Sequence, residues 1–141
     1  MSALRLLLAV AFLGLCVHYW HAWREEKALQ AIASPNGFLP VPMPTNTPPN
    51  TVLIFAPLNC PREGAQRAEA LSQKLNELGI KNIKTASYAA ATFENTEENL
   101  ASYKRLNVVM TGEIPIALVN GMGKANPTID ELVAEYNSTQ P

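Results

Sequence analysis

The chain has 141 residues, a length suited to one modest domain, and its 11 basic and 12 acidic residues leave a formal net charge of −1. The sequence contains no basic stripe able to hold phosphates, so nucleic acid is excluded as a partner. Two cysteines, Cys16 and Cys60, cannot make a disulfide framework, which excludes the class of small disulfide-stapled domains.

Residues 1–23 are predicted to form a transmembrane anchor. From residue 6 to residue 17 every side chain is apolar or glycine, and the run between Arg5 and Trp23 just reaches the roughly 17–20 residues that cross a bilayer. Tyr19, Trp20 and Trp23 at the end of this run fit the aromatic belt found at membrane surfaces.

A cleaved signal peptide is the alternative interpretation of the same segment. A cleavage site needs small residues soon after the apolar run, and the pattern of that kind at 31–33 lies beyond the charged residues 24–27. We therefore expect an uncleaved signal-anchor and a single-pass membrane protein. The very short tail before the apolar run favours a cytosolic N-terminus, so the expected location is a bacterial inner membrane with the soluble domain in the periplasm.

Residues 24–50 are predicted to be a juxtamembrane segment followed by a proline-rich linker. Between Ser34 and Asn50 the prolines are Pro35, Pro40, Pro42, Pro44, Pro48 and Pro49. Proline at this density forbids helix and favours extended polyproline-type backbone. We expect a semi-rigid stalk that carries the domain at 51–141 away from the bilayer. A docking motif for a partner protein is the alternative.

The folded domain is predicted to start with a strand, a helix and a second strand. The continuous apolar run at 51–56 is typical of a strand buried on both faces. Apolar residues then recur at helical spacing, and Gly79 is placed to end the helix. These apolar residues are Ala65, Ala68, Leu71, Leu75 and Leu78. Residues 80–88 form the expected second strand, parallel to the first.

The second half of the domain is predicted to contain a helix, a hairpin and a last helix. Thr96 caps a helix that runs to about Leu106. A third strand at 114–119 leads through the turn signal Asn120-Gly121 into a weak fourth strand at 122–125. Residues 128–131 form a capping box that opens the last helix. The predicted order is β-α-β-α-β-β-α.

Three short motifs in this order resemble glutaredoxins, a group within the thioredoxin-fold superfamily. Cys60-Pro61 follows the strand residue Phe55 by five positions, as at the start of a glutaredoxin C-P-x-C site. Residues 78–80, Leu-Gly-Ile, match the end of the first helix, and the segment from Ile114-Pro115 to Asn120-Gly121 matches the family's V-P-x-x-x-x-N-G. The resemblance implies a three-layer α/β sandwich and a cis Pro115 that faces the cysteine.

The chain departs from the family pattern at the residues that would hold a second thiol and glutathione. Glu63 replaces the second cysteine, so the site reads CPRE and cannot form an internal disulfide. Pro57 stands where family members often carry a basic residue, and residues 124–130 replace the Gly-Gly and acidic motif. We therefore expect no cofactor, and the departures weigh against glutathione. No metal site is expected, since His18 and His21 are interpreted as interfacial residues.

The resemblance implies a thiol–disulfide oxidoreductase that acts through Cys60 alone on protein thiols or disulfides. A thiol at a helix N-terminus is stabilised as the reactive thiolate, and Arg62 adds to that effect, while Glu63 opposes it. Pro61, Arg62, Ile114 and Pro115 are the predicted substrate-binding residues. The alternative function is a non-catalytic thioredoxin-fold module that binds or scaffolds partners at a membrane.

Overall fold

The computed structural model describes residues 3–57, 62–89 and 95–140, and the chain divides into two compact units, Met1–Ile32 and Ala33–Pro141. The first unit is the helix α1 (Ala3–Ile32), 30 residues long and without a buried residue. By length and composition α1 can cross a membrane. At about 1.5 Å per residue it measures about 45 Å, and it continues as helix nine residues past Trp23.

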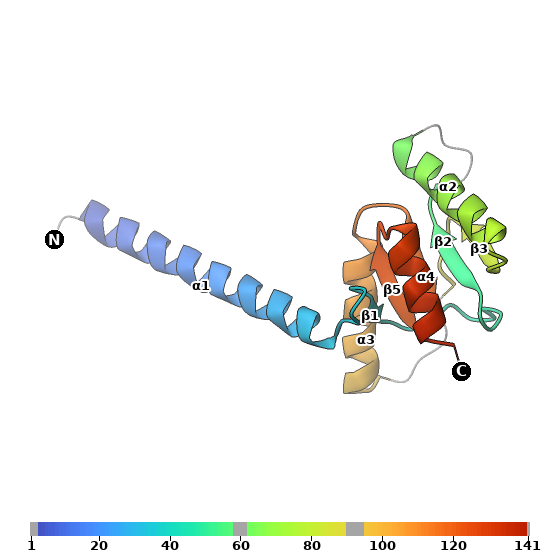
Figure 1. Cartoon of the computed structure of the whole chain (residues 1–141). Coiled ribbons are helices and arrows are strands. Elements are labelled where there is room, and N and C mark those ends of the chain that lie inside the picture. Colours follow the sequence, from blue (N-terminus) through green and yellow to red (C-terminus); the bar gives the residue numbers. More distant parts are fainter. Residues whose placement is uncertain (1–2, 58–61, 90–94, 141) are drawn as a thin grey trace. The chain divides into compact units, whose positions relative to one another are not determined.

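The second unit is an α/β fold built on one mixed five-stranded sheet, which confirms the predicted class (Figure 1). The strands are arranged in the order β1-β5-β4-β2-β3. Strands β2 and β3 pair in parallel, and the other pairs are antiparallel. The strands are β1 (Leu39–Pro40), β2 (Val52–Phe55), β3 (Asn82–Thr85), β4 (Ile116–Val119) and β5 (Met122–Ala125).

The β2–α2–β3 unit forms much as the sequence pattern predicts. All four residues of β2 are buried, as expected of a strand covered on both faces. Helix α2 (Glu63–Glu77) buries Ala68, Leu71 and Leu75. Leu78 was expected on the same stripe but is 57% exposed. It is the C-cap residue, one position beyond the last turn, where the chain leaves the helix through the positive φ of Gly79.

The remaining elements also follow their local signals. Helix α3 (Glu97–Met110) starts where Thr96 Oγ1 accepts a hydrogen bond from the backbone N–H of Asn99. Asn120 and Gly121 both have positive φ and join β4 to β5 as a tight hairpin. Helix α4 (Ile129–Ser138) opens with the predicted capping box, in which Thr128 and Glu131 bond to each other's backbone.

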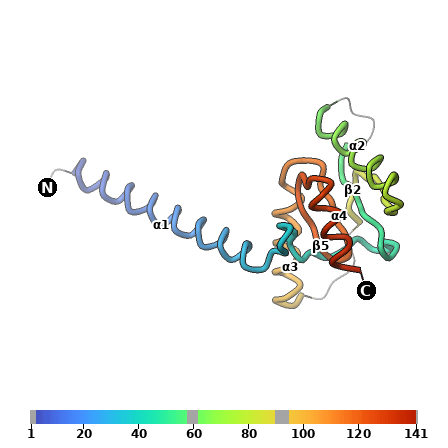
Figure 2. The backbone as a smooth tube through the Cα atoms, in the orientation of Figure 1, coloured from blue at the N-terminus to red at the C-terminus, as the bar shows by residue number. Residues whose placement is uncertain are grey.

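Helices cover both faces of the sheet, and each face has its own apolar core (Figure 2). Alternate residues of β2 supply the two cores, because successive side chains of a strand point to opposite faces. On the α2 and α4 side the largest buried residues are Phe38, Ile54, Leu75 and Leu132. On the α3 side the buried residues include Phe55, Leu106 and Leu118.

The structure differs from the sequence expectation in the proline-rich segment. Phe38 is fully buried in the core, Val41 is 6% exposed, and β1 pairs with β5. The guanidinium of Arg105 donates to the carbonyl of Pro40 at 2.7 Å. Proline is tolerated on an edge strand because its missing N–H is not needed there. Residues 38–41 are therefore part of the folded unit rather than of a stalk.

A buried carboxylate fastens the start of this segment to α4. Glu135 is 1% exposed, and its Oε2 accepts hydrogen bonds from Ser34 Oγ at 2.7 Å and Asn36 Nδ2 at 2.9 Å. Lys124 of β5 donates to the carbonyl of Asn36 at 2.9 Å. A buried charge is tolerated only where such donors surround it, so this cluster fixes residues 34–36 on the second unit.

Candidate functional site

The predicted nucleophile and its neighbour lie outside the described residues. Cys60 and Pro61 fall in the gap between Pro57 and Arg62, at the connection from β2 to α2. Arg62 is exposed, has an extended backbone and is the N-cap of α2, so it lies one position before the first turn of the helix. Cys60 thus precedes the N-cap by two residues, and Glu63 is the first helical residue.

The first turn of α2 packs directly against the bend that precedes β4. A Cβ atom placed on Gly64 would lie 2.4 Å from Cγ1 of Ile114, so the helix backbone touches the Ile114 side chain. The peptide bond between Ile114 and Pro115 is cis, as the resemblance implies, and Pro115 is buried. The structure therefore places the first turn of α2, which begins one residue after the exposed Arg62, against the bend formed by Ile114 and Pro115.

Arg67 joins α2 to the bend before β4, although no sequence motif identifies it. Its Nη1 donates to Glu63 at 2.7 Å, and its Nη2 donates to Glu113 at 2.6 Å and to the carbonyl of Ile114 at 2.8 Å. The guanidinium compensates the charge of Glu63, the carboxylate expected to oppose a thiolate. No local signal identifies this role, because Glu113 is 46 residues away along the chain.

Both carbonyls of the bend have hydrogen-bond partners. The carbonyl of Ile114 accepts from Arg67, and the carbonyl of Pro115 accepts from the backbone N–H of Asn126 at 2.7 Å. Asn126 follows β5 and has a positive φ of 45°, a conformation that asparagine adopts more readily than most residues. The bend is thus held from α2 on one side and from the β5–α4 connection on the other.

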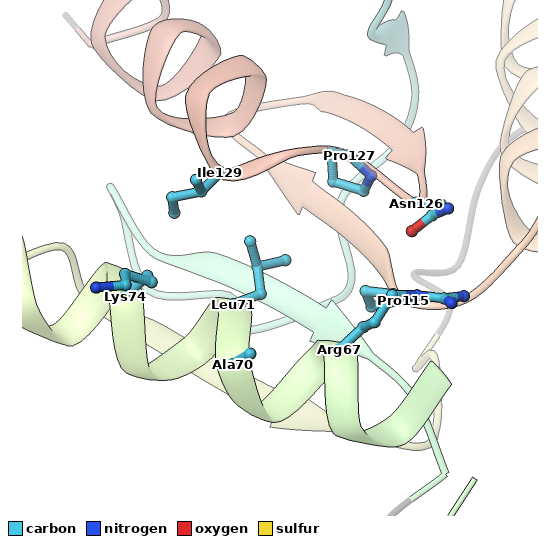
Figure 3. Close-up of a pocket in the computed structure, with 8 residues that line it drawn as sticks. All are labelled: Arg67, Ala70, Leu71, Lys74, Pro115, Asn126, Pro127 and Ile129. Carbon is cyan, nitrogen blue, oxygen red and sulfur yellow. The ribbon is translucent and has the colours of Figure 1, made fainter. Parts of the chain in front are cut away.

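A mostly apolar pocket of about 250 Å³ opens beside this bend, between α2 and the connection from β5 to α4 (Figure 3). Leu71 lies between the two sides of the pocket, with Arg67 and Ala70 of α2 on one side and Pro127 and Ile129 on the other (Figure 3). Such a pocket suits an aliphatic side chain better than a charged group. Its lining residues are Arg67, Ala70, Leu71, Lys74, Pro115, Asn126, Pro127 and Ile129.

Residues 124–131, from the end of β5 to the first turn of α4, make contacts within the second unit. Lys124 forms an ion pair with Glu131 at 2.8 Å as well as its bond to Asn36. The hydrogen bond from Lys124, joined by the backbone N–H of Thr128, lowers the pKa of the Glu131 carboxyl. Among residues 3–57, 62–89 and 95–140 no group of three or more His, Cys, Asp or Glu side chains is arranged to hold a metal ion.

Comparisons of the chain with protein-family models, with curated proteins and with solved structures found no match.

Proposed function

We propose that the protein is a membrane-anchored, glutaredoxin-like domain of thioredoxin type that exchanges thiols and disulfides through Cys60. Two features of the fold support the domain type. The elements from β2 to α4 follow the order β-α-β-α-β-β-α that the resemblance implies. The first two strands of that order, β2 and β3, are parallel neighbours, and the last two, β4 and β5, form a hairpin.

The observation that carries the proposal is the contact between the first turn of α2 and the Ile114–Pro115 bend. It supports a site at the end of α2 where the resemblance expects one. Cys60 is two residues from the N-cap of this helix. Unpaired N–H groups and the positive end of the helix dipole stabilise a thiolate at such a position.

The exchange needs one protein thiol and one external thiol. The Cys60 thiolate attacks one sulfur of a substrate disulfide, forms a mixed disulfide with it and releases the other sulfur as a thiolate. An external thiolate then attacks the mixed disulfide, forms a disulfide with the substrate sulfur and returns Cys60 as a thiolate. An external thiol is required because Glu63 occupies the position of a second cysteine.

The pH dependence of Cys60 alkylation tests this proposal. In the full chain with Cys16→Ala, Cys60 is the one remaining thiol. We expect a rate midpoint below about pH 7, because an activated thiol ionises well below the free value of about 8.5. The same variant in denaturant is the matched control and should show the free value. A folded-state midpoint at or above the control value would contradict the proposal.

A second candidate function, a non-catalytic binding module, is favoured by the bond from Arg67 to the carbonyl of Ile114. The exchange proposal requires the backbone beside Pro115 to bind an extended substrate segment. The carbonyl of Ile114, however, already accepts a hydrogen bond from Arg67. A module would use the apolar pocket instead. Two results together would support the module: an alkylation midpoint of Cys60 at the free value, and binding of a partner segment that the Leu71→Gln variant abolishes.

The anchor proposal concerns α1. We propose that it crosses a bacterial inner membrane, with the second unit in the periplasm; its length and its apolar composition support the crossing. A reporter enzyme active only outside the cytosol, fused after Pro141, tests the orientation. Activity of that reporter is the expected result, and activity of a cytosol-specific reporter at the same position would reverse the assignment.

A further inference from the structure

We propose that α1 carries a binding site for anionic phospholipid headgroups, formed by Trp20, Trp23, Arg24 and Lys27. The proposal rests on the membrane anchoring proposed above and adds a lipid preference to it. The ligand is a headgroup with a net negative charge, at the level where the apolar part of α1 ends.

The four residues lie on one face of the helix, because they are spaced three and four positions apart. The guanidinium carbon of Arg24 lies 4.7 Å from the centroid of the Trp20 ring. The ammonium of Lys27 lies 6.0 Å from the ring centroid of Trp23. Each cation therefore stands one turn after an indole along the helix, toward the end that is farther from the apolar run at 6–17.

The acidic residues of this segment do not face the two cations. Glu25 and Glu26 stand one or two positions from each cation, and residues at these spacings do not face each other on a helix. Glu26 accepts a hydrogen bond from Gln30, on the next turn, at 3.1 Å. The helix thus turns the two cations away from the two carboxylates, although the four charges cancel in the sequence.

This arrangement matches the chemistry of an anionic bilayer surface. Indole rings sit at the headgroup level, and the aliphatic stems of Arg and Lys let their charged ends reach the phosphates. A basic residue near an anionic membrane surface favours binding by about fivefold. A zwitterionic headgroup carries its own ammonium group, which opposes this attraction. The face made by Arg24 and Lys27 should therefore select lipids with net negative charge.

Tryptophan quenching by brominated lipids tests the proposal on the full chain. The two tryptophans of the sequence, Trp20 and Trp23, both belong to the site, so their fluorescence reports the lipids next to it. The chain is placed in bilayers of phosphatidylcholine and phosphatidylglycerol, with one lipid brominated near the headgroup end of its acyl chains. We expect a preference for phosphatidylglycerol of about fivefold or more that weakens as salt is added.

The double variant Arg24→Gln/Lys27→Gln should bring this preference close to unity while keeping both tryptophans. The control Lys81→Gln/Lys104→Gln makes the same charge change on exposed residues of the second unit and should keep the preference. Equal quenching by both lipids in the unmodified chain, or an unchanged preference in the Arg24/Lys27 variant, would overturn the proposal. If neither lipid quenches, α1 is outside the bilayer, and the membrane anchoring fails as well.

Discussion

Arg67 contacts three groups around the first turn of α2 and the bend before β4. Its guanidinium connects α2 to Glu113 and to the carbonyl of Ile114, and it pairs with Glu63 on the same helix. The carboxylate of Glu63 is therefore compensated, at the position where the proposed glutaredoxin-like site would otherwise carry a second thiol. The Arg67 side chain also occupies a backbone acceptor that a substrate would otherwise use, so it bears on both candidate functions.

Glu135 is the other residue whose role depends on partners far away in sequence. Replacing it with Ala removes the acceptor of Ser34 and Asn36 and leaves two donors without their carboxylate. We expect the free energy of unfolding to fall by about 2–3 kcal/mol, the cost of unsatisfied buried groups. Urea denaturation measures it, with Asn137→Ala, an exposed change on the same helix, as the control. Equal losses in the two variants would contradict the role of Glu135.

The ion pair between Glu131 and Lys124 predicts a small pH dependence of stability. Because the folded-state pKa of Glu131 is lowered, its contribution is present above the ordinary value of 4.5 and is lost as the pH falls below it. Glu131→Gln keeps the capping box, so it removes the charge alone. We expect it to cost about 0.5 kcal/mol at neutral pH, because both side chains are partly exposed.

The free energy of unfolding is measured for the unmodified chain and for Glu131→Gln at each pH, and the two values are subtracted. That difference should shrink toward zero in acid, where Glu131 is protonated in both states. A difference that stays constant with pH would show that the variant acts through packing rather than through charge.

At the scale of elements, α2 is positioned by the close approach of Gly64 to Ile114. Gly64→Ala brings a methyl group to 2.4 Å from Cγ1 of Ile114, so we expect a loss of about 1–2 kcal/mol despite the better helix propensity of Ala. In an Ile114→Ala background the clash is gone, and the same change should be neutral or stabilising. Equal effects of Gly64→Ala in both backgrounds, measured by denaturation, would show that the two residues do not interact.

Elements with strong local signals could be predicted from the sequence, and long-range contacts could not. The continuous apolar run at β2, the turn at Asn120-Gly121 and the capping box of Thr128 and Glu131 are all properties of adjacent residues. The bonds of Arg67 to Glu113 and Glu135 to Ser34 join positions 46 and 101 residues apart, which no periodicity reveals. Of the predicted site, the placement of Cys60 and Pro61 stays a prediction.

The six prolines between Ser34 and Asn50 predict a linker, because they are a stronger sequence signal than the few apolar residues among them. Phe38 and Val41 stand between turn and proline residues, where neither strand nor helix periodicity can develop. The structure buries both, and Tyr88 donates to the carbonyl of Pro42 at 3.0 Å. Proline density therefore predicts the absence of helix at 34–50 correctly, but turns at 45–46 and 49–50 interrupt the extended backbone, and composition does not decide whether the segment is packed.

At the scale of the whole molecule, this packing sets where the folded unit begins. We expect a fragment of residues 33–141 to fold. A fragment of residues 51–141 should have a lower free energy of unfolding. The difference should exceed the cost of losing one buried Phe, which is about 3–5 kcal/mol. The second fragment lacks Phe38, Val41 and β1. Urea denaturation of the two fragments compares them, and equal midpoints would restore the stalk interpretation.

Reduction of a mixed disulfide tests the central claim, exchange through Cys60, most directly. The full chain with Cys16→Ala is compared with the same chain carrying Cys60→Ser, both with an excess of external thiol. We predict that the first reduces a peptide mixed disulfide faster than the external thiol alone, and that the second falls to that background rate. Equal rates for both variants would contradict the account and leave the second unit as a binding module.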